Sequence, residues 1–241
     1  GRLNYATARA VNSKQIVAKR PDSAELFNQF RYGHRLVVSI NDGRPVPFDC
    51  IEFSDAIACV DVLYDLAFLL MDLSFRGFAT AANRVLNAYL MALDAADLEA
   101  TLDGLAVLPL FLSCRAGVRA HIDARVAAAH GSDAERARLT RRAQAYLRLA
   151  RDALAPSAAR LVAVGGLSGS GKSTLAAGLA PHLGLPPGAV VLRSDLLRKR
   201  AFDVAPTARL GDEAYTPEVN ARVYQRQRHL AQRTIAAGWP V

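Results

Sequence analysis

The stretch that decides the expected fold runs from residue 161 to residue 174 and reads LVAVGGLSGSGKST. Its apolar beginning, 161–165, has the composition of a buried β-strand. A Gly/Ser-rich loop follows at 166–171, and residues 172–183 have the pattern of a helix. A second apolar run at 189–192 predicts the next strand. Strand, helix and strand in this order predict a βαβ unit with a parallel sheet, and therefore an α/β fold.

The loop matches the pattern G-x-x-x-x-G-K-[ST], beginning at Gly166. Its glycines let backbone N–H groups turn inward, where a Cβ would obstruct a phosphate. The helix that follows offers free N–H groups and a positive dipole end to an anion. The loop therefore predicts a site for the phosphates of ATP or GTP. The nucleotide-binding residues that we expect are Gly166, Ser168, Gly169, Ser170, Gly171, Lys172, Ser173 and Thr174.

Three side chains at the start of this helix carry the predicted chemistry. Lys172 is a compact charge that can reach the β- and γ-phosphates, and the hydroxyl of Ser173 can bind Mg²⁺ as the metal ligand. Thr174 can support the α-phosphate region. ATP and Mg²⁺ are therefore the expected cofactors. The alternative interpretation is a Gly/Ser loop that joins a strand to a helix and carries an incidental lysine.

The second predicted strand leads into the polar residues Arg193, Ser194 and Asp195. Ligands of open α/β sheets lie at the carboxyl ends of the strands, so we expect Asp195 near the phosphate loop. A carboxylate there can accept the proton of an acceptor hydroxyl as the γ-phosphoryl group moves. Arg198 can hold an anionic substrate or transition-state charge. The alternative is that Asp195 caps the next helix and that the basic residues form a solvated face. The expected catalytic residues are Lys172, Asp195 and Arg198.

The upstream half has a different pattern. Two strand-like runs, 35–40 and 46–53, flank the turn signal Asn41-Asp42-Gly43-Arg44, so we expect a hairpin. Pro45 and Pro47 place it at the edge of a sheet. From Asp61 to about Leu154, apolar residues at helical spacing predict a series of packed helices. A short linker then leads to the strand–loop–helix region, and we place a domain boundary there, giving domains 1–156 and 157–241.

Composition restricts the remaining classes. The chain has 241 residues, a formal net charge of +8 and three cysteines. Its basic residues are mostly arginines spread along Ala-rich stretches, which favours solvated helix faces over a nucleic-acid site. The most apolar stretch, 56–73, is interrupted by Asp61, Asp65 and Asp72, so we expect no membrane span. Unpaired cysteines without an export signal indicate a cytoplasmic protein.

Residues 166–174 and 193–199 together resemble the small P-loop kinases that include polynucleotide-kinase-like and zeta-toxin-like enzymes. In that family an Asp after the second strand serves the acceptor hydroxyl and a nearby Arg serves the substrate. The resemblance implies these roles for Asp195 and Arg198. It also implies a later strand with a metal-associated carboxylate and an Arg-bearing lid beyond Val241, so we expect a C-terminally truncated domain.

Residues 42–53, with 61–69 after them, resemble the C-terminal lobe of aminoglycoside phosphotransferases. The order of parts is similar to bacterial two-part proteins that join such a lobe to an ATP-binding P-loop part of the small-kinase, AAA type. Asp49 matches the metal-binding Asp of that family. However, 32–40 lacks the catalytic Asp, and the nucleotide-binding lobe is absent. We therefore expect 1–156 to be incomplete and inactive.

Three functional hypotheses follow. The first is that the full-length parent of this chain is a kinase that transfers the γ-phosphoryl group of ATP to a small-molecule hydroxyl, with the nucleotide and the acceptor as its partners. The second is a non-catalytic nucleotide-binding module. The third is a polynucleotide-kinase-like enzyme that processes nucleic-acid ends, which a steep salt dependence of oligonucleotide binding would identify.

Overall fold

The computed structural model describes residues 37–41, 44–48, 61–129, 132–167 and 169–241. Predictions that concern other positions, including those for Asp49 and Ser168, lie outside the described residues. The chain divides into two compact units, Gly1–Leu69 and Leu70–Val241. The predicted boundary near residue 157 falls inside the second unit and stays a prediction.

The first unit contains the predicted hairpin. Strand β1 (Val37–Asn41) pairs antiparallel with β2 (Arg44–Phe48), and Val37 lies opposite Phe48. Pro45 and Pro47 both lie in β2, and a two-stranded sheet has only edge strands, so neither proline interrupts a central ladder. The hairpin prediction is confirmed, and the strands extend to Asn41 and Arg44 on the two sides of the turn. Helix α5 (Val62–Phe75) begins in this unit and ends in the second.

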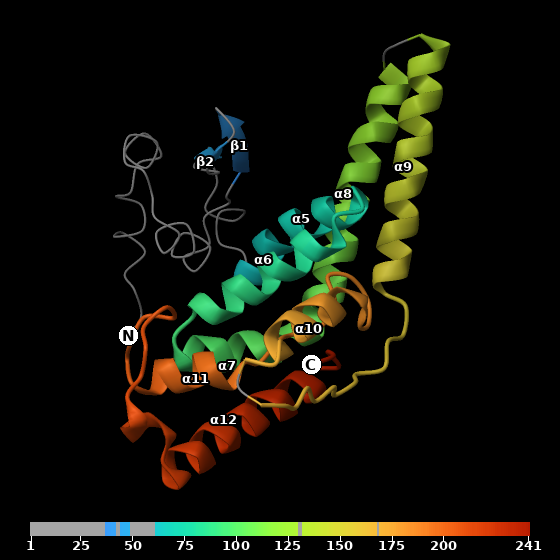
Figure 1. Ribbon diagram of the computed structural model, residues 1–241. Helices are drawn as coiled ribbons and strands as arrows, with labels where there is room; N and C mark the ends of the chain where they lie inside the picture. Colours follow the sequence, from blue (N-terminus) through green and yellow to red (C-terminus); the bar gives the residue numbers. More distant parts are fainter. Residues whose placement is uncertain (1–36, 42–43, 49–60, 130–131, 168) are drawn as a thin grey trace. The chain divides into compact units, whose positions relative to one another are not determined.

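The second unit is helical in its described residues (Figure 1). The helices predicted between residues 61 and 154 are confirmed. Three helices that begin in this unit start at side-chain caps: the side chains of Asp94, Ser132 and Thr216 accept the backbone N–H three residues later. The elements after α5 are α6 (Ala79–Ala92), α7 (Ala95–Gly104), the 3₁₀ turn η1 (Leu105–Val107), α8 (Leu108–Ala129), α9 (Asp133–Ala153), α10 (Lys172–Leu179), η2 (Ala180–His182), α11 (Ser194–Ala201), η3 (Asp212–Tyr215) and α12 (Pro217–Ala236).

Helices α8 and α9 form a long antiparallel pair (Figure 1). Small and aliphatic side chains on their facing sides, such as Ala116, Ala120 and Leu139, are buried. Arg142 of α9 binds Asp123 of α8 through two hydrogen bonds of 2.5 Å each. The pair therefore combines apolar packing with one bidentate charge pair.

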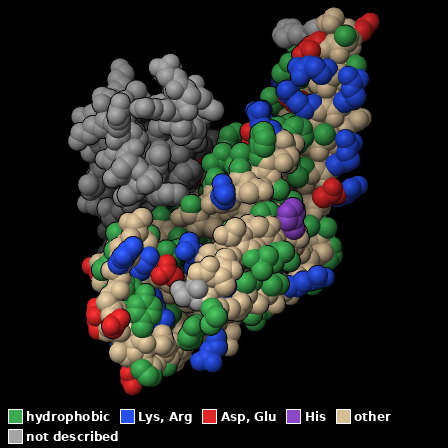
Figure 2. All heavy atoms as spheres, viewed as in Figure 1, with side chains coloured by type: hydrophobic (Ala, Val, Ile, Leu, Met, Phe, Trp, Pro, Cys, Tyr) green, Lys and Arg blue, Asp and Glu red, His purple; other side chains and the backbone are tan. Residues whose placement is uncertain are grey.

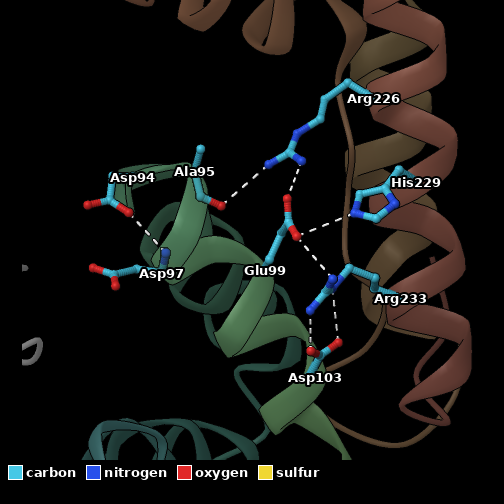
Figure 3. A network of polar contacts seen from close by, with 8 residues as sticks. All are labelled: Asp94, Ala95, Asp97, Glu99, Asp103, Arg226, His229 and Arg233. Atoms are coloured by element: carbon cyan, nitrogen blue, oxygen red, sulfur yellow. Dashed lines mark hydrogen bonds and ion pairs between the residues drawn. The ribbon is translucent and has the colours of Figure 1, made fainter.

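Helices α7 and α12 are joined by an ionic network (Figure 3). Glu99 of α7 accepts hydrogen bonds from Arg226 and Arg233 of α12, and His229 lies 3.4 Å from the same carboxylate. Arg233 also binds Asp103. A helix upstream of residue 157 is thus bound to the helix that precedes Trp239, Pro240 and Val241.

By length and composition alone, the helical stretch Ala95–Ala129 meets the criteria for a membrane span. It consists of α7, η1 and α8, and its carboxylates Glu99 and Asp103 form ion pairs with arginines of α12. The absence of a membrane-spanning segment therefore stays a prediction.

The predicted parallel sheet is not formed. Val241 donates to the Arg160 carbonyl and accepts from the Val162 N–H, each at 2.9 Å, which is the pattern of a parallel pair confined to one residue. The N–H of Val190 donates to the Pro240 carbonyl at 2.9 Å. No described residue from 157 to 241 belongs to a strand.

The exposure of the first predicted strand gives a physical reason for this difference. Leu161 is 67% exposed and Val162 is 40% exposed, so the apolar run lacks the buried face that a core strand needs. One or two backbone hydrogen bonds between extended segments do not make a ladder. The prediction of an α/β fold with a parallel sheet is therefore wrong, and the described part of the chain is predominantly helical.

Candidate functional site

The phosphate loop, residues 166–171, joins the extended segment 160–165 to α10. Gly166, Gly169 and Gly171 have φ angles of 148°, 77° and 82°. Side chains other than glycine rarely adopt such angles, so the backbone requires the glycines of the motif. The N–H of Ser170 donates to the Leu167 carbonyl at 3.3 Å and closes a turn inside the loop.

The loop is tight at Gly166 and open at its other two glycines. A Cβ added at Gly166 would lie 2.9 Å from the Ser170 hydroxyl oxygen and 3.6 Å from Cγ of Lys172. The loop therefore curls closely around the position that a side chain at 166 would occupy. Cβ atoms built at Gly169 and Gly171 meet nothing within 4 Å, which leaves that side open to a ligand. Gly171 is the N-cap of α10, so the free N–H groups of the helix begin directly after the loop.

The expected phosphate and metal ligands lie in the first turn of α10. The ammonium group of Lys172 donates a hydrogen bond to the Leu167 carbonyl of the loop. An ammonium group has three donors, so two remain for phosphate oxygens. Ser173 and Thr174 are exposed.

The described residues offer no separate metal centre. They contain no group of three or more His, Cys, Asp or Glu side chains arranged to hold a metal ion. Mg²⁺ commonly binds through few protein ligands together with phosphate oxygens and water. The exposed Ser173 hydroxyl beside the cradle fits that kind of site.

Asp195 lies in the first turn of α11, with its side chain 44% exposed. Its carboxylate is 3.2 Å from the ammonium of Lys199 and 3.8 Å from the guanidinium of Arg193. The N-cap of α11 is Arg193, and no side chain makes a capping hydrogen bond there. The alternative interpretation of Asp195 as a helix cap is therefore wrong, and the carboxylate is free of backbone partners at this helix end.

Unlike Asp195, Arg198 is buried and only 5% exposed. Its guanidinium donates to the Ala214 carbonyl and to the Asn220 side chain, the latter at 2.7 Å. It also lies 4.8 Å from the ring centroid of Tyr215. Arg198 thus holds α11 to the region at the start of α12, and its role toward a substrate stays a prediction.

Three amide side chains that the sequence analysis missed surround the segment leading to Asp195. Asn83 and Asn87 of α6 and Gln227 of α12 all hydrogen-bond backbone groups of residues 187–192. The available signal was the pair of asparagines four residues apart in an otherwise Ala- and Leu-rich helix. Its partner segment, about a hundred residues downstream, has no marker in the sequence.

The comparisons with known proteins support a P-loop domain at the C-terminal end of this sequence. Residues 161–241 match the AAA_33 family, described as "AAA domain", which is a P-loop, kinase-like family. "Uncharacterized protein Rv2004c" of Mycobacterium tuberculosis (strain ATCC 25618 / H37Rv) is 34% identical over 162 residues, covering 67% of this chain and 30% of that protein. "Uncharacterized protein Mb2027c" of Mycobacterium bovis (strain ATCC BAA-935 / AF2122/97) matches with the same values.

The chain thus spans about 30% of the length of these relatives. No solved structure matches it significantly. The matches show no aminoglycoside-phosphotransferase features. What they do show is a P-loop domain of the AAA_33 type at residues 161–241.

Proposed function

We propose that residues 161–241 bind ATP with Mg²⁺ and that the protein transfers the γ-phosphoryl group to the hydroxyl of a small molecule. The observation that carries this proposal is the phosphate loop. Its three glycines at positive φ curl around an open cradle that ends at the N-terminus of α10. The family match is to a kinase-like P-loop domain, which favours phosphoryl transfer over simple nucleotide storage.

Each residue of the loop has a role in this proposal. Backbone N–H groups of 166–171 and of the first turn of α10 bind the phosphate oxygens. Lys172 neutralises charge on the β- and γ-phosphates, and Thr174 supports the α-phosphate region. Ser173 would hold the Mg²⁺ ion, which when bound supplies further neutralisation of phosphate charge. Asp195 accepts the proton of the acceptor hydroxyl.

The charge distribution supports a small-molecule acceptor over a nucleic acid. On the face shown in Figure 2, Lys and Arg side chains are spread along the α8–α9 pair with acidic residues among them. Several of these arginines are paired locally, as in Arg136 with Asp133 and Arg138 with Glu135. Because these charges are paired locally, the positive electrostatic field that would attract a polyanion is weaker. We further propose a cytoplasmic location and no membrane partner.

Nothing shows aminoglycoside-phosphotransferase features in the upstream region, so that resemblance does not identify the acceptor. Asp49, which would be its metal ligand, lies outside the described residues. The acceptor is therefore proposed by chemical class alone, as a small molecule with a free hydroxyl group.

Calorimetric titration with MgATP tests the nucleotide site. Lys172→Ala should weaken binding by about 10- to 100-fold, because a hydrogen bond to a charged group contributes about 1.5–3 kcal/mol. Arg222→Ala is a matched control, since it removes an exposed cation from α12. Equal affinity for MgATP in wild type and Lys172→Ala would refute the assignment of the loop.

A further inference from the structure

The amide side chain of Asn87, on α6, takes the place of a neighbouring strand beside residues 189–191. Its Nδ2 donates to the Ala189 carbonyl at 3.1 Å, and its Oδ1 accepts from the Val191 N–H at 2.6 Å. A residue of a parallel strand would bond the same two groups, because it donates to one residue and accepts from the residue two positions later. The Asn87 side chain thus makes the two hydrogen bonds that a neighbouring strand would otherwise make with residues 189–191.

Two further contacts extend along the same helix. Asn83 donates to the carbonyls of Pro187 and Ala189, each at 2.9 Å. The carbonyl of Met91 accepts from the guanidinium of Arg200 in α11. Asn83, Asn87 and Met91 are spaced four residues apart, so they lie on one face of α6. This face of α6 contacts the chain from residue 187 to Arg200 in α11.

Residues 187–192 also make hydrogen bonds to parts of the chain other than α6. The N–H of Val190 donates to the Pro240 carbonyl at 2.9 Å, and Gln227 of α12 donates to the Leu192 carbonyl at 2.6 Å. Gly188 lies so close to η2 that an added Cβ would be 2.3 Å from the Ala180 carbonyl oxygen. The segment is therefore fixed along its length, and α6 supplies the contacts on one edge.

From this arrangement we infer that α6 is the platform that positions Asp195, with Asn87 as the main positioning residue. The catalytic part of the inference rests on the proposed phosphoryl transfer. Asp195 follows Leu192 by three residues, and its own side chain is half exposed and, among the described residues, makes only ion pairs with Lys199 and Arg193. Its placement therefore depends on the backbone around it: α6 holds one edge of the segment before it, and Arg198 holds the helix in which it lies. The helical region upstream of residue 157 thus serves the P-loop domain directly.

Amide hydrogen exchange of the whole chain tests the platform without any acceptor. Asn87→Leu removes both hydrogen bonds at similar size and should speed exchange in 189–201 by about tenfold, since a hydrogen bond contributes about 1 kcal/mol or more. Exchange in α10 and affinity for MgATP should stay unchanged. Arg84→Leu, on the exposed side of the same helix, is the control and should leave both segments unchanged.

A second variant covers the case in which Asn87→Leu does not fold. Asn87→Ala removes the same hydrogen bonds with a smaller apolar side chain, so it should also speed exchange in 189–201. Unchanged exchange in 189–201 for a folded Asn87 variant overturns the inference. Equal acceleration over the whole chain also overturns it, because Asn87 would then contribute only to global stability.

Measurements of turnover distinguish a positioning role of Asn87 from a contribution to general stability. With ADP release from MgATP as the readout, Asn87→Leu should lower kcat by about tenfold at unchanged KM for ATP. In an Asp195→Asn background the same substitution should have less than about a twofold effect, because the group it positions is gone. A full effect in both backgrounds would contradict positioning. Failure of the wild type to bind MgATP would reject the proposed function instead, and the exchange result would still decide the platform.

Discussion

Arg233 of α12 and Glu99 of α7 form an ion pair with 3.0 Å between Nη1 and Oε2. The two residues are 134 positions apart in the chain. Arg226 and His229 reach the same carboxylate from neighbouring turns of α12 (Figure 3). One carboxylate therefore connects the upstream helices to the helix that leads to Trp239 and Pro240.

This network predicts a specific pH dependence of stability. The hydrogen bonds from Arg226, and next from His229, hold the pKa of Glu99 below its usual value of 4.5. A lowered pKa in the folded state stabilises the fold fully above the unfolded pKa, and this contribution is lost as the pH falls through the folded pKa. Glu99→Gln should therefore lower the urea midpoint at neutral pH and flatten its fall below about pH 5.

Glu135→Gln is the matched control for this measurement. Glu135 pairs with Arg138 within α9, three residues along the same helix, and both side chains are largely exposed. The hydrogen bond from Arg138 also lowers the pKa of Glu135, but an exposed pair within one helix contributes little to stability, so the midpoint at neutral pH should barely change. Equal midpoints for Glu99→Gln and wild type at neutral pH would show that the network does not stabilise the fold.

The bidentate pair between Arg142 and Asp123 predicts a second stability effect. The Asp123 side chain is only 3% exposed, and the hydrogen bonds from Arg142 lower its pKa. Arg142→Gln leaves this carboxylate without its charged partner, which should cost about 1–3 kcal/mol in the free energy of unfolding. Arg136→Gln, which breaks the exposed pair with Asp133, should cost about 0.5 kcal/mol or less. Similar losses in urea unfolding for both variants would contradict the buried role of Asp123.

Much of the local structure could be predicted because its signals are local. The glycines at 166, 169 and 171 have positive φ because the turn demands it, and the motif records that demand. Packed helices between residues 61 and 154 follow from apolar residues at helical spacing. The hairpin at β1 and β2 follows from two apolar runs around a turn signal.

The parallel sheet could not be predicted correctly because strand formation depends on partners elsewhere. The run 161–165 has strand composition, yet its first residues are exposed and its backbone pairs at one point only. At 189–191 the partner on one edge is the side chain of Asn87 rather than a strand. Arg198 illustrates the same limit, because its partners Ala214 and Asn220 are set by how α11 packs against the start of α12.

Asp195 is the residue on which the kinase proposal depends most. Because Asp195 does not cap α11, replacing it by Asn changes no backbone hydrogen bond at the helix start. The substitution keeps the size of the side chain and removes its ion pairs with Lys199 and Arg193, which are surface interactions of small energy. The free energy of unfolding should therefore stay nearly unchanged. A loss of activity in Asp195→Asn would then report on chemistry.

The expected loss follows from the role of a general base, which contributes about 10²–10⁴ in rate. Asp195→Asn should lower kcat by roughly that factor while the affinity for MgATP is unchanged, the pattern of an interaction made only in the transition state. Lys199→Gln is the matched control, because it removes the same ion pair and keeps the carboxylate. If Lys199→Gln loses as much kcat as Asp195→Asn, the ion pair and not the base is responsible. Wild-type turnover in Asp195→Asn would leave a nucleotide-binding module as the better description of residues 161–241.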